Sequence, residues 1–280
     1  MPEGDTLFRT AAGLRPHLVG RTVVAAHARQ PGPRADLLVG RTVTEVLAIG
    51  KNLVIRFDPD LELRTHLGMR GSWHRYRPGE PWRRPPARAR ISLEVPGAVA
   101  VCFDAPTAEI LETRAEALHP PLGGLGPDLL GTAFDAEEAL RRLRAPERAS
   151  ASIATALLDQ KAVAGVGNVY CDESLFLERV DPFARVADLP DSTLRRLVER
   201  ARTLLDANRT TPRRTTTPDP MTATGRRLWV YGRAGRPCHR CGAILLARRH
   251  GDLPRRRTWC PRCQASGAGT AESVPAPARR

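Results

Sequence analysis

Cys238-His239-Arg240-Cys241, followed after eighteen residues by Cys260-Pro261-Arg262-Cys263, is the stretch that most strongly determines how this chain folds. Each Cys-x-x-Cys turn directs two sulfurs at one centre, and a hairpin between the turns brings the two pairs together. This spacing predicts one structural Zn²⁺ bound by Cys238, Cys241, Cys260 and Cys263. Two disulfides, or four unrelated thiols, are the alternatives that the sequence leaves open.

The segment around these cysteines is strongly basic. Residues 226–263 contain eleven arginines and one acidic residue, Asp252, and the whole chain carries a formal net charge of +14 at pH 7. Lys51 and Lys161 are the only lysines among 44 basic residues. A zinc-bound hairpin with this charge is suited to bind phosphate groups, so the composition favours an anionic partner.

Three further features bear on the compartment. No run of about twenty apolar residues is present, so no segment is predicted to span a membrane. The start Met-Pro-Glu-Gly-Asp-Thr lacks the basic-then-apolar pattern of a secretory signal. Six cysteines, four of them in zinc spacing, fit a reducing compartment, with Cys102 and Cys171 as small buried residues. We therefore expect a cytoplasmic protein.

The first half of the chain reads as a helix followed by a β domain. A helix is expected at 5–19, with Asp5 as its N-cap and one apolar face formed by Leu7, Phe8, Ala11, Leu14 and Leu18. Short β-like runs separated by Gly and Pro clusters follow at 22–25, 53–57, 90–95 and 99–103. The Pro- and Arg-rich stretch 76–90 is predicted as a loop. This pattern predicts a mostly antiparallel β-sandwich.

The second half of the chain is helical in pattern. Helices are expected at 135–143, with Asp135 as the cap, and at 151–161, 169–178 and 192–206, before a polar connector at 210–217. We therefore predict four regions: a β-sandwich domain at 1–131, a helical domain at 132–225, a zinc ribbon at 226–264 and a disordered tail at 265–280.

Pro2 and Glu3 are candidates for chemistry. Methionine aminopeptidase removes Met1 when a small residue follows, which would leave Pro2 with a free secondary amine. Such an amine can attack the sugar carbon of a nucleotide and form an iminium, a covalent Schiff base. Glu3 could move protons to the sugar ring oxygen or to departing groups. Taken alone, Met-Pro-Glu is also a start that many chains have by chance.

Two turns carry residues suited to hold phosphate. In Ile49-Gly50-Lys51-Asn52-Leu53, Gly50 permits a tight turn that would present the Lys51 ammonium beyond a sheet edge. In Gly165-Val166-Gly167-Asn168, the glycines permit a backbone path that side chains would block, and Asn168 stands at the N-cap of the next helix. A solvated lysine and a connection needed only for packing are the alternatives.

Met69 and the arginines before the third cysteine complete the candidates. Met69 lies between Gly68 and Gly71 on a predicted loop and could fill the space left by an extruded base, with a core methionine as the alternative. Arg255, Arg256 and Arg257 lead into Cys260, and arginines on a rigid hairpin can bind phosphate with bidentate geometry. A merely solvated basic strand is the alternative.

Taken together, these pieces resemble the formamidopyrimidine-DNA glycosylase and endonuclease VIII (Fpg/Nei) family from Pro2 to about Gln264. The segments that carry the resemblance are Met-Pro-Glu-Gly at the start, Gly50-Lys51-Asn52-Leu53, His66-Leu67-Gly68-Met69, Leu158-Asp159-Gln160, Gly165 through Tyr170, and the ribbon ending Cys-Pro-Arg-Cys-Gln. The resemblance implies an α+β multidomain protein with an N-terminal β-sandwich and flanking helices, a helix–two-turn–helix DNA-binding domain and a zinc ribbon. It also implies damaged double-stranded DNA as the partner, no membrane, and a monomer.

The resemblance further implies an activity in base-excision repair. A bifunctional DNA glycosylase and AP lyase would displace a damaged base with Pro2 and cut the strand on both sides of the lost nucleoside. The roles implied are Glu3 as acid/base, Lys51 as a catalytic phosphate ligand, and Asn168 as a second phosphate ligand. Arg255 would be the DNA-binding arginine of the ribbon, and Arg257 would be its substitute.

The sequence also departs from the family pattern. The start differs from that of the oxidised-purine branch, Thr6 stands where both branches usually have Glu, and no Arg-Arg-Phe-Gly follows Phe103-Asp104. Together with Gly71-Ser72-Trp73-His74, these differences favour the endonuclease VIII branch of actinobacteria, with oxidised pyrimidines and abasic sites as substrates. Two alternatives stay open: a non-catalytic binder of abasic or damaged DNA, and an 8-oxoguanine or formamidopyrimidine glycosylase.

Overall fold

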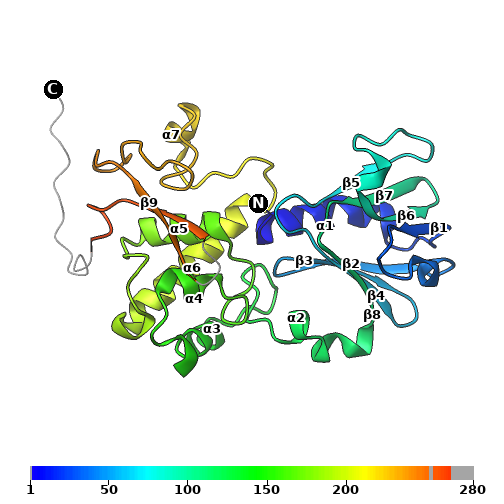
Figure 1. The fold of residues 1–280 in the computed structure, drawn as a ribbon, viewed down its shortest axis with the longest axis horizontal. Helices are drawn as coiled ribbons and strands as arrows, with labels where there is room; N and C mark the ends of the chain where they lie inside the picture. Colours follow the sequence, from blue (N-terminus) through cyan, green and yellow to red (C-terminus); the bar gives the residue numbers. More distant parts are fainter. Residues whose placement is uncertain (1, 252–254, 266–280) are drawn as a thin grey trace. The chain divides into compact units, whose positions relative to one another are not determined.

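The computed structural model describes residues 2–251 and 255–265, so Met1 and nearly all of the predicted tail at 265–280 lie outside the described residues. The chain divides into two compact units, each built from separate stretches of sequence (Figure 1). The first unit comprises Met1–Arg142, Asp159–Gly167 and Leu205–Arg213, and the second comprises Leu143–Leu158, Asn168–Leu204 and Arg214–Arg280. The four predicted regions are continuous stretches, and their boundaries stay a prediction.

The first unit contains the predicted β-sandwich. Its two antiparallel four-stranded sheets have the orders β1-β6-β7-β5 and β2-β3-β4-β8 (Figure 1). The strands are β1 Ala25–Ala28, β2 Val43–Ile49, β3 Asn52–Phe57, β4 Leu61–His66, β5 Ser72–Tyr76, β6 Ala89–Val95, β7 Ala98–Phe103 and β8 Thr107–Glu112. The strands predicted at 53–57, 90–95 and 99–103 are confirmed. The strand predicted at 22–25 is wrong except for its last residue, because Thr22 and Val23 pair with residues 41–42 before the chain reaches β6.

Helix α1 (Gly4–Leu18) completes the core of the sandwich. Its buried face joins the apolar cluster between the sheets through Leu7, Ala11, Leu14 and Leu18. Phe8, predicted for the same face, lies instead against the guanidinium of Arg209, 5.5 Å from its ring centre. The prediction of Asp5 as the N-cap is wrong, because the helix starts one residue earlier with Glu3 at the N-cap position. Asp5 is buried in the first turn, 3.4 Å from Arg9.

The remaining helical segments of the first unit are short. They are η1 Ala35–Leu38, η2 Pro86–Arg88, η3 Thr113–Leu118, α2 Pro120–Gly123 and, at the border with the second unit, α3 Ala136–Leu143. The predicted cap of α3 is confirmed, since Asp135 Oδ1 accepts hydrogen bonds from the backbone N–H groups of Glu137 and Glu138 at 2.9 and 3.0 Å.

The second unit combines helices with one β-hairpin. Its elements are η4 Pro146–Arg148, α4 Ile153–Leu158, α5 Asn168–Leu177, η5 Val186–Asp188, most of α6 Asp191–Asn208, α7 Asp219–Ala223, β9 Leu246–His250 and β10 Arg255–Trp259. The predicted helices are all present, although α4 ends before Asp159, whose carboxylate accepts the backbone N–H of Lys161 at 2.9 Å and forms a turn. In the described part of the chain, no helix combines the length and apolar character needed to cross a bilayer.

Helix α5 is the central support of the second unit. Every residue from Val169 to Phe176 is buried, so neighbours surround the helix on all sides. Hairpin β9–β10 connects the two cysteine pairs, as the cysteine spacing predicts, and β10 packs on α5. Polar side chains that α5 directs toward β10 are therefore held in well-defined positions.

Candidate active site and nucleic-acid interface

The N-terminal segment is fixed by the chain around Gly167. Glu3 is fully buried, and its Oε2 accepts a hydrogen bond from the backbone N–H of Gly167 at 2.8 Å. The backbone N–H of Gly4 donates to the carbonyl oxygen of Gly165 at 2.9 Å. A Cβ on Gly167 would lie 2.3 Å from Cδ of Glu3, so any side chain there would displace the carboxylate. Residues 165–167 thus follow a backbone path that side chains would block, as predicted. The groups that pack closely against this backbone are Glu3 and Gly4.

Pro2 directly precedes this fixed segment. Glu3 has extended backbone, and its carbonyl oxygen accepts the N–H groups of Thr6 and Leu7 at 2.9 and 3.2 Å. The residue after Pro2 is thus held by its side chain and its main chain at once. Pro2 itself is half-buried at the amino end of α1. Its position is therefore set by the helix and by Gly167.

The turn that carries Lys51 packs against the same segment. Gly50 has φ +58°, and its N–H donates to Asp128 Oδ2 at 2.7 Å. A Cβ on Gly50 would lie 3.2 Å from Cβ of Ala164 and 3.7 Å from the backbone nitrogen of Gly165. The left-handed conformation and the close approach both favour glycine at this turn. Residues 164–167 therefore bring the Lys51 turn and the Glu3 segment to one place in the first unit.

Asp128 is a site residue that the sequence reasoning missed. Besides Gly50, its carboxylate accepts the backbone N–H of Leu130 at 3.0 Å. Burial raises the pKa of Asp128, and the two N–H donors oppose that rise. Gly126-Pro127-Asp128 has the composition of a turn, but nothing in that composition indicates a partner 78 positions earlier in the chain.

A polar chain lies beside Lys51 on the sheet β2-β3-β4-β8. Arg64 is nearly buried, and it donates to Asn52 Oδ1 at 3.0 Å and to Glu109 Oε2 at 2.8 Å. Burial, followed by the charges of Arg64 and Lys51, lowers the pKa of His66. His66 is therefore neutral near pH 7, and positive charge at this end of the sheet comes from Arg64 and Lys51.

Met69 lies at the surface, in the turn between β4 and β5. The residue is 71% exposed, which excludes the alternative of a core methionine, whereas Leu67 is buried. The turn is closed by a 2.8 Å hydrogen bond from the N–H of Gly71 to the carbonyl of Leu67. Between β7 and β8 the chain makes only a short turn, in which Asp104 has φ +53° and binds Arg84 and Arg88 at 2.7 Å.

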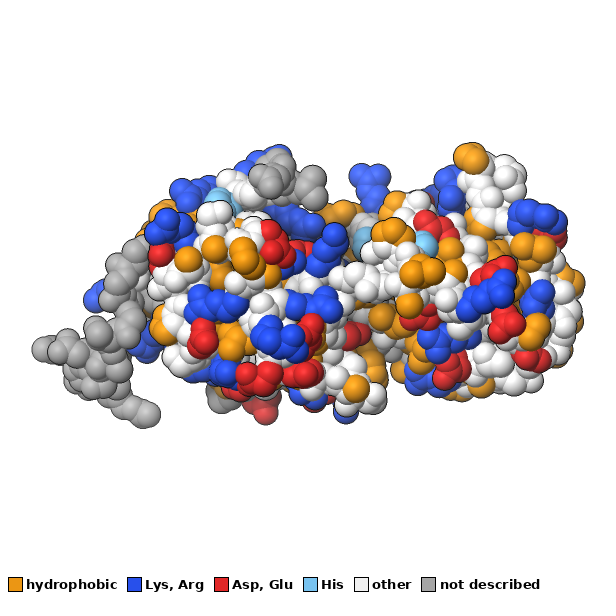
Figure 2. Space-filling view, turned by 90° about the horizontal axis from the view of Figure 1, so that it is seen from below, with side chains coloured by type: hydrophobic (Ala, Val, Ile, Leu, Met, Phe, Trp, Pro, Cys, Tyr) orange, Lys and Arg blue, Asp and Glu red, His pale blue; other side chains and the backbone are white. Residues whose placement is uncertain are grey.

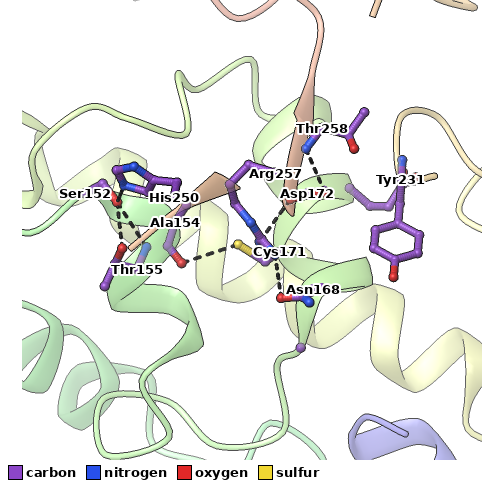
Figure 3. A network of polar contacts seen from close by, with 12 residues as sticks. Ser152, Ala154, Thr155, Asn168, Cys171, Asp172, Tyr231, His250, Arg257 and Thr258 are labelled. Carbon is purple, nitrogen blue, oxygen red and sulfur yellow. Dashed lines mark hydrogen bonds and ion pairs between the residues drawn. The ribbon is translucent and has the colours of Figure 1, made fainter. Parts of the chain in front are cut away.

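Asn168 and the ribbon arginines belong to the second unit. Asn168 is the first residue of α5, and its Oδ1 accepts a hydrogen bond from Nη2 of Arg257 at 2.5 Å (Figure 3). Arg257 is only 1% exposed, and its Nη1 lies 3.0 Å from Oδ1 of the equally buried Asp172. Arg255 is half-buried at the start of β10, and Arg256 is exposed. Of the three arginines, Arg257 thus faces the protein interior.

The four ribbon cysteines fit a tetrahedral metal site. Their sulfurs all lie within 4.8 Å of one another, and all six cysteines of the chain are free, so the disulfide alternative is wrong. Zinc–sulfur bonds of about 2.3 Å place the sulfurs of a tetrahedral site about 3.8 Å apart. The backbone N–H groups of Arg240 and Cys263 point at Sγ of Cys238 and Cys260, at 3.4 Å each. Such donors stabilise thiolates, the form that binds metal.

Glu173 attaches the ribbon to α5, and sequence reasoning missed it as well. Its buried carboxylate accepts the backbone N–H groups of Trp229, Val230 and Tyr231, each at 2.8 Å. Phe176, three residues further on, stacks on Trp229 with ring centres 5.5 Å apart. Two adjacent acids, Asp172 and Glu173, within an otherwise largely apolar helix were the available signal.

Part of the positive charge is neutralised by neighbouring acids. Figure 2 shows one face on which basic and acidic side chains lie intermixed over both units. Among the ion pairs of the second unit, Arg196 and Arg200 bind Glu178 at 3.3 and 2.8 Å. Despite the net charge of +14, the face drawn in Figure 2 is therefore not uniformly basic.

Comparison with known proteins shows the family to which this chain belongs. Family models named formamidopyrimidine-DNA glycosylase N-terminal domain and formamidopyrimidine-DNA glycosylase H2TH domain match residues 1–107 and 125–217. A Streptomyces coelicolor protein named "Probable endonuclease 8 2" is 43% identical over 272 residues, which are 96% of this chain and 95% of that protein. The Mycolicibacterium smegmatis protein named DNA-(apurinic or apyrimidinic site) lyase Nei2 is 43% identical, over 95% of this chain and 100% of that protein.

A solved structure shows the same fold. Lactococcus lactis formamidopyrimidine-DNA glycosylase, non-covalently bound to DNA containing an AP site, has a TM-score of 0.77 at 23% identity, over 94% of this chain and 100% of that chain. The protein therefore belongs to the Fpg/Nei family of base-excision-repair DNA glycosylases with AP lyase activity. A Mycobacterium bovis protein named Endonuclease 8 2 is 44% identical over 94% of this chain, and a Stenotrophomonas maltophilia protein named formamidopyrimidine-DNA glycosylase is 34% identical over 94% of this chain. The family and fold predicted from the sequence are confirmed.

Proposed function

We propose that this protein excises oxidised bases from DNA and cleaves the strand at the abasic site through a covalent intermediate on Pro2. The observation that carries the proposal is the burial of Glu3 against Gly167. The contact with Gly167 holds the Glu3 carboxylate in place directly after Pro2 in the sequence. Removal of Met1 would make the Pro2 amine the amino terminus of the chain. A catalytic acid must first lie within reach of the atom that it protonates, and this hydrogen bond fixes the position of the Glu3 carboxylate.

The residues support a sequence of balanced steps. The Pro2 amine attacks C1′ of the damaged nucleotide, the bond from C1′ to the base breaks, and the base leaves with a proton. Glu3 protonates the ring oxygen as the sugar opens, which leaves an iminium between Pro2 and C1′. Loss of a C2′ proton then expels the 3′ phosphate, and a second elimination expels the 5′ phosphate. Hydrolysis of the iminium frees Pro2.

We assign phosphate binding to three residues. Lys51 is presented by a glycine turn held by Asp128, Asn168 begins the buried helix α5, and Arg255 begins the strand that packs on it. Contacts of this kind fix the position of DNA without reading its sequence. Exposed Met69 is suited to enter the space of an extruded base.

We further propose oxidised pyrimidines and abasic sites as substrates, and one Zn²⁺ as a structural cofactor. The start of the chain and the short turn between β7 and β8 support the substrate class. The four clustered sulfurs support the zinc, which would hold the two turns of the ribbon together when bound. We expect a monomer acting on damaged double-stranded DNA in the bacterial cytoplasm, at the nucleoid.

Borohydride trapping on an oligonucleotide with one abasic site tests the mechanism. The expected result is a covalent adduct on the N-terminal tryptic peptide, with Met1 absent and Pro2 modified. Tight binding to the same DNA without an adduct would instead indicate a non-catalytic damage-binding protein. Single-turnover excision of an oxidised pyrimidine and of 8-oxoguanine tests the substrate class, and faster release of 8-oxoguanine would contradict it.

A further inference from the structure

Arg257 connects the zinc hairpin to the start of α5 through two side chains. Its Nη2 donates to Asn168 Oδ1 at 2.5 Å, and its Nη1 lies 3.0 Å from Asp172 Oδ1 (Figure 3). Asn168 and Asp172 are four residues apart on a helix and therefore lie on one face of α5. The guanidinium thus binds both residues of that face at once.

Asp172 holds β10 by its main chain as well. Its Oδ2 accepts the backbone N–H of Thr258 at 3.1 Å, while its Oδ1 is the atom near Arg257. Two neighbouring residues of β10 are therefore bound by one carboxylate. With both Asp172 and Arg257 only 1% exposed, solvent does not compete for these contacts. The guanidinium cannot turn outward without leaving a buried carboxylate behind.

This arrangement decides which atom of the Asn168 amide faces the arginine. A guanidinium carries only donors, so the atom that it contacts must be the amide oxygen. The amide nitrogen, with its two donors, lies on the opposite branch of the side chain, as Figure 3 shows. A phosphate oxygen only accepts hydrogen bonds, so an asparagine fixed in this orientation presents the complementary atom.

We propose that Arg257, held by Asp172, is a positioning residue that fixes the Asn168 amide with its NH₂ group toward a DNA phosphate. The inference rests on the proposed function, in which Asn168 binds a phosphate beside the lesion. Arg257 acts through Asn168 and does not itself contact DNA. Arg255 and Arg257 carry the same charge but would then have different roles. Arg255 binds a phosphate directly, and Arg257 orients Asn168.

Asn168→Asp tests the orientation directly. The variant's carboxylate would keep one oxygen toward Arg257 and form a second ion pair with it, so the fold and zinc content should be retained. Its other oxygen would replace the amide nitrogen that faces the phosphate, and two acceptors repel. We expect binding to a tetrahydrofuran abasic-site duplex to weaken about 10- to 100-fold. Affinity equal to that of the unchanged protein would overturn the inference.

A double-mutant cycle tests whether Arg257 acts through Asn168. Arg257→Met, Asn168→Ala and the double variant are titrated with the same duplex over a series of salt concentrations. Each single variant should weaken binding about 10-fold at every salt concentration. The salt slope should stay unchanged, because a neutral amide neutralises no phosphate, and the double variant should bind no more weakly than either single variant. Additive losses, or an unchanged affinity in Arg257→Met, would contradict the positioning role.

Two controls separate this inference from other failures. Arg185→Met removes the exposed pair of Arg185 with Asp188 in the same unit and should leave affinity unchanged. If Arg257→Met loses zinc or unfolds, Asn168→Asp alone decides. Borohydride trapping of the unchanged protein reports on the proposed function: no adduct means that the proposed function fails. If the unchanged protein forms an adduct but Asn168→Asp binds the abasic-site duplex with unchanged affinity, only the positioning role fails.

Discussion

The carboxylate of Glu3 and the backbone N–H of Gly167 are joined by a 2.8 Å hydrogen bond across 164 positions of the chain. The bond forms because a residue without a side chain lets the buried carboxylate reach the backbone. The proposed catalytic acid therefore depends on a glycine that has no chemical group to contribute.

Gly167→Ala should abolish most strand cleavage. The added methyl group would lie 2.3 Å from Cδ of Glu3, so the carboxylate must move, and a displacement of about 1 Å can cost about 100-fold in rate. We expect single-turnover cleavage of abasic DNA to fall by about that factor while affinity changes little. Gly13→Ala is the matched control, since a Cβ at this helical position meets open space and should slightly stabilise α1. Equal cleavage by both variants would refute the role of Gly167.

Pro2→Gly should separate chemistry from binding. Glycine supplies a primary amine without the ring that constrains the proline nitrogen, so the attack on C1′ loses its preorganised nucleophile. We expect a large loss of strand cleavage and of borohydride-trapped adduct, with nearly unchanged affinity for abasic DNA. A comparable loss of affinity would show that Pro2 contributes to binding and not to the reaction.

Lys51→Ala should weaken DNA binding regardless of sequence. Removing one ammonium that neutralises one phosphate lowers the salt slope of log Kd by about 0.9. Titration of one duplex at several salt concentrations measures this slope. Lys161→Ala removes the same charge from the other lysine, which is exposed. Comparing the two variants shows whether the effect depends on the position of the lysine or only on the loss of one positive charge. A slope unchanged in Lys51→Ala would count against a phosphate contact there.

Glu62 should make stability depend on pH. It is fully buried, and burial followed by the charge of Glu116 raises its pKa from 4.5 to about 7. The folded state thus binds this proton more tightly than the unfolded state, and its stabilising effect is complete below pH 4.5 and lost as the pH rises through 7. The Glu62→Gln side chain cannot ionise, so the stability of this variant should not show this fall as the pH rises through 7.

Urea unfolding of the unchanged protein and of Glu62→Gln at about pH 5.5, 7 and 8.5 measures the difference. The variant should gain stability relative to the unchanged protein as the pH rises. Glu112→Gln, at an exposed ion pair with Arg114, should show no such trend. Parallel stability curves for the unchanged protein and Glu62→Gln would contradict the assignment.

Metal removal should unfold the ribbon and spare the sandwich. The apolar cluster of the ribbon is small, and Cys238 and Cys260 are themselves part of it, so bound metal must supply much of its stability. A chelator should release one zinc per chain, change the near-ultraviolet circular dichroism of Trp229 and Trp259, and weaken DNA binding. Full DNA affinity in the chelated protein would show that the ribbon is not part of the interface.

Features with a local or periodic signal could be predicted from the sequence. Short β-like runs between Gly and Pro clusters predicted the sandwich, helical apolar patterns predicted the helices, and the cysteine spacing predicted the hairpin between its two turns. Asp135 was recognised as a cap because its partners are the next few residues. Asp5 was misassigned by the same reasoning, because tertiary contacts of Glu3 and Gly4 start α1 one residue earlier.

The contacts that assemble the site could not be predicted in this way. Glu3 with Gly167, Gly50 with Asp128, and Arg257 with Asn168 each join single residues that are 78 to 164 positions apart. One polar residue has no periodicity, and its partner depends on the packing of elements that lie between them. The separate environments of Arg255 and Arg257 likewise follow from the packing of β10 on α5, which three consecutive arginines do not reveal.

The discontinuity of the first unit has a consequence for synthesis on the ribosome. Glu3 is translated 164 positions before Gly167, an interval of roughly ten to thirty seconds at bacterial elongation rates. Throughout that interval the nascent amino end lacks the segment that buries Glu3, so aminopeptidase can reach it. The proposed acid Glu3 thus reaches its buried position only after Gly167 has been translated.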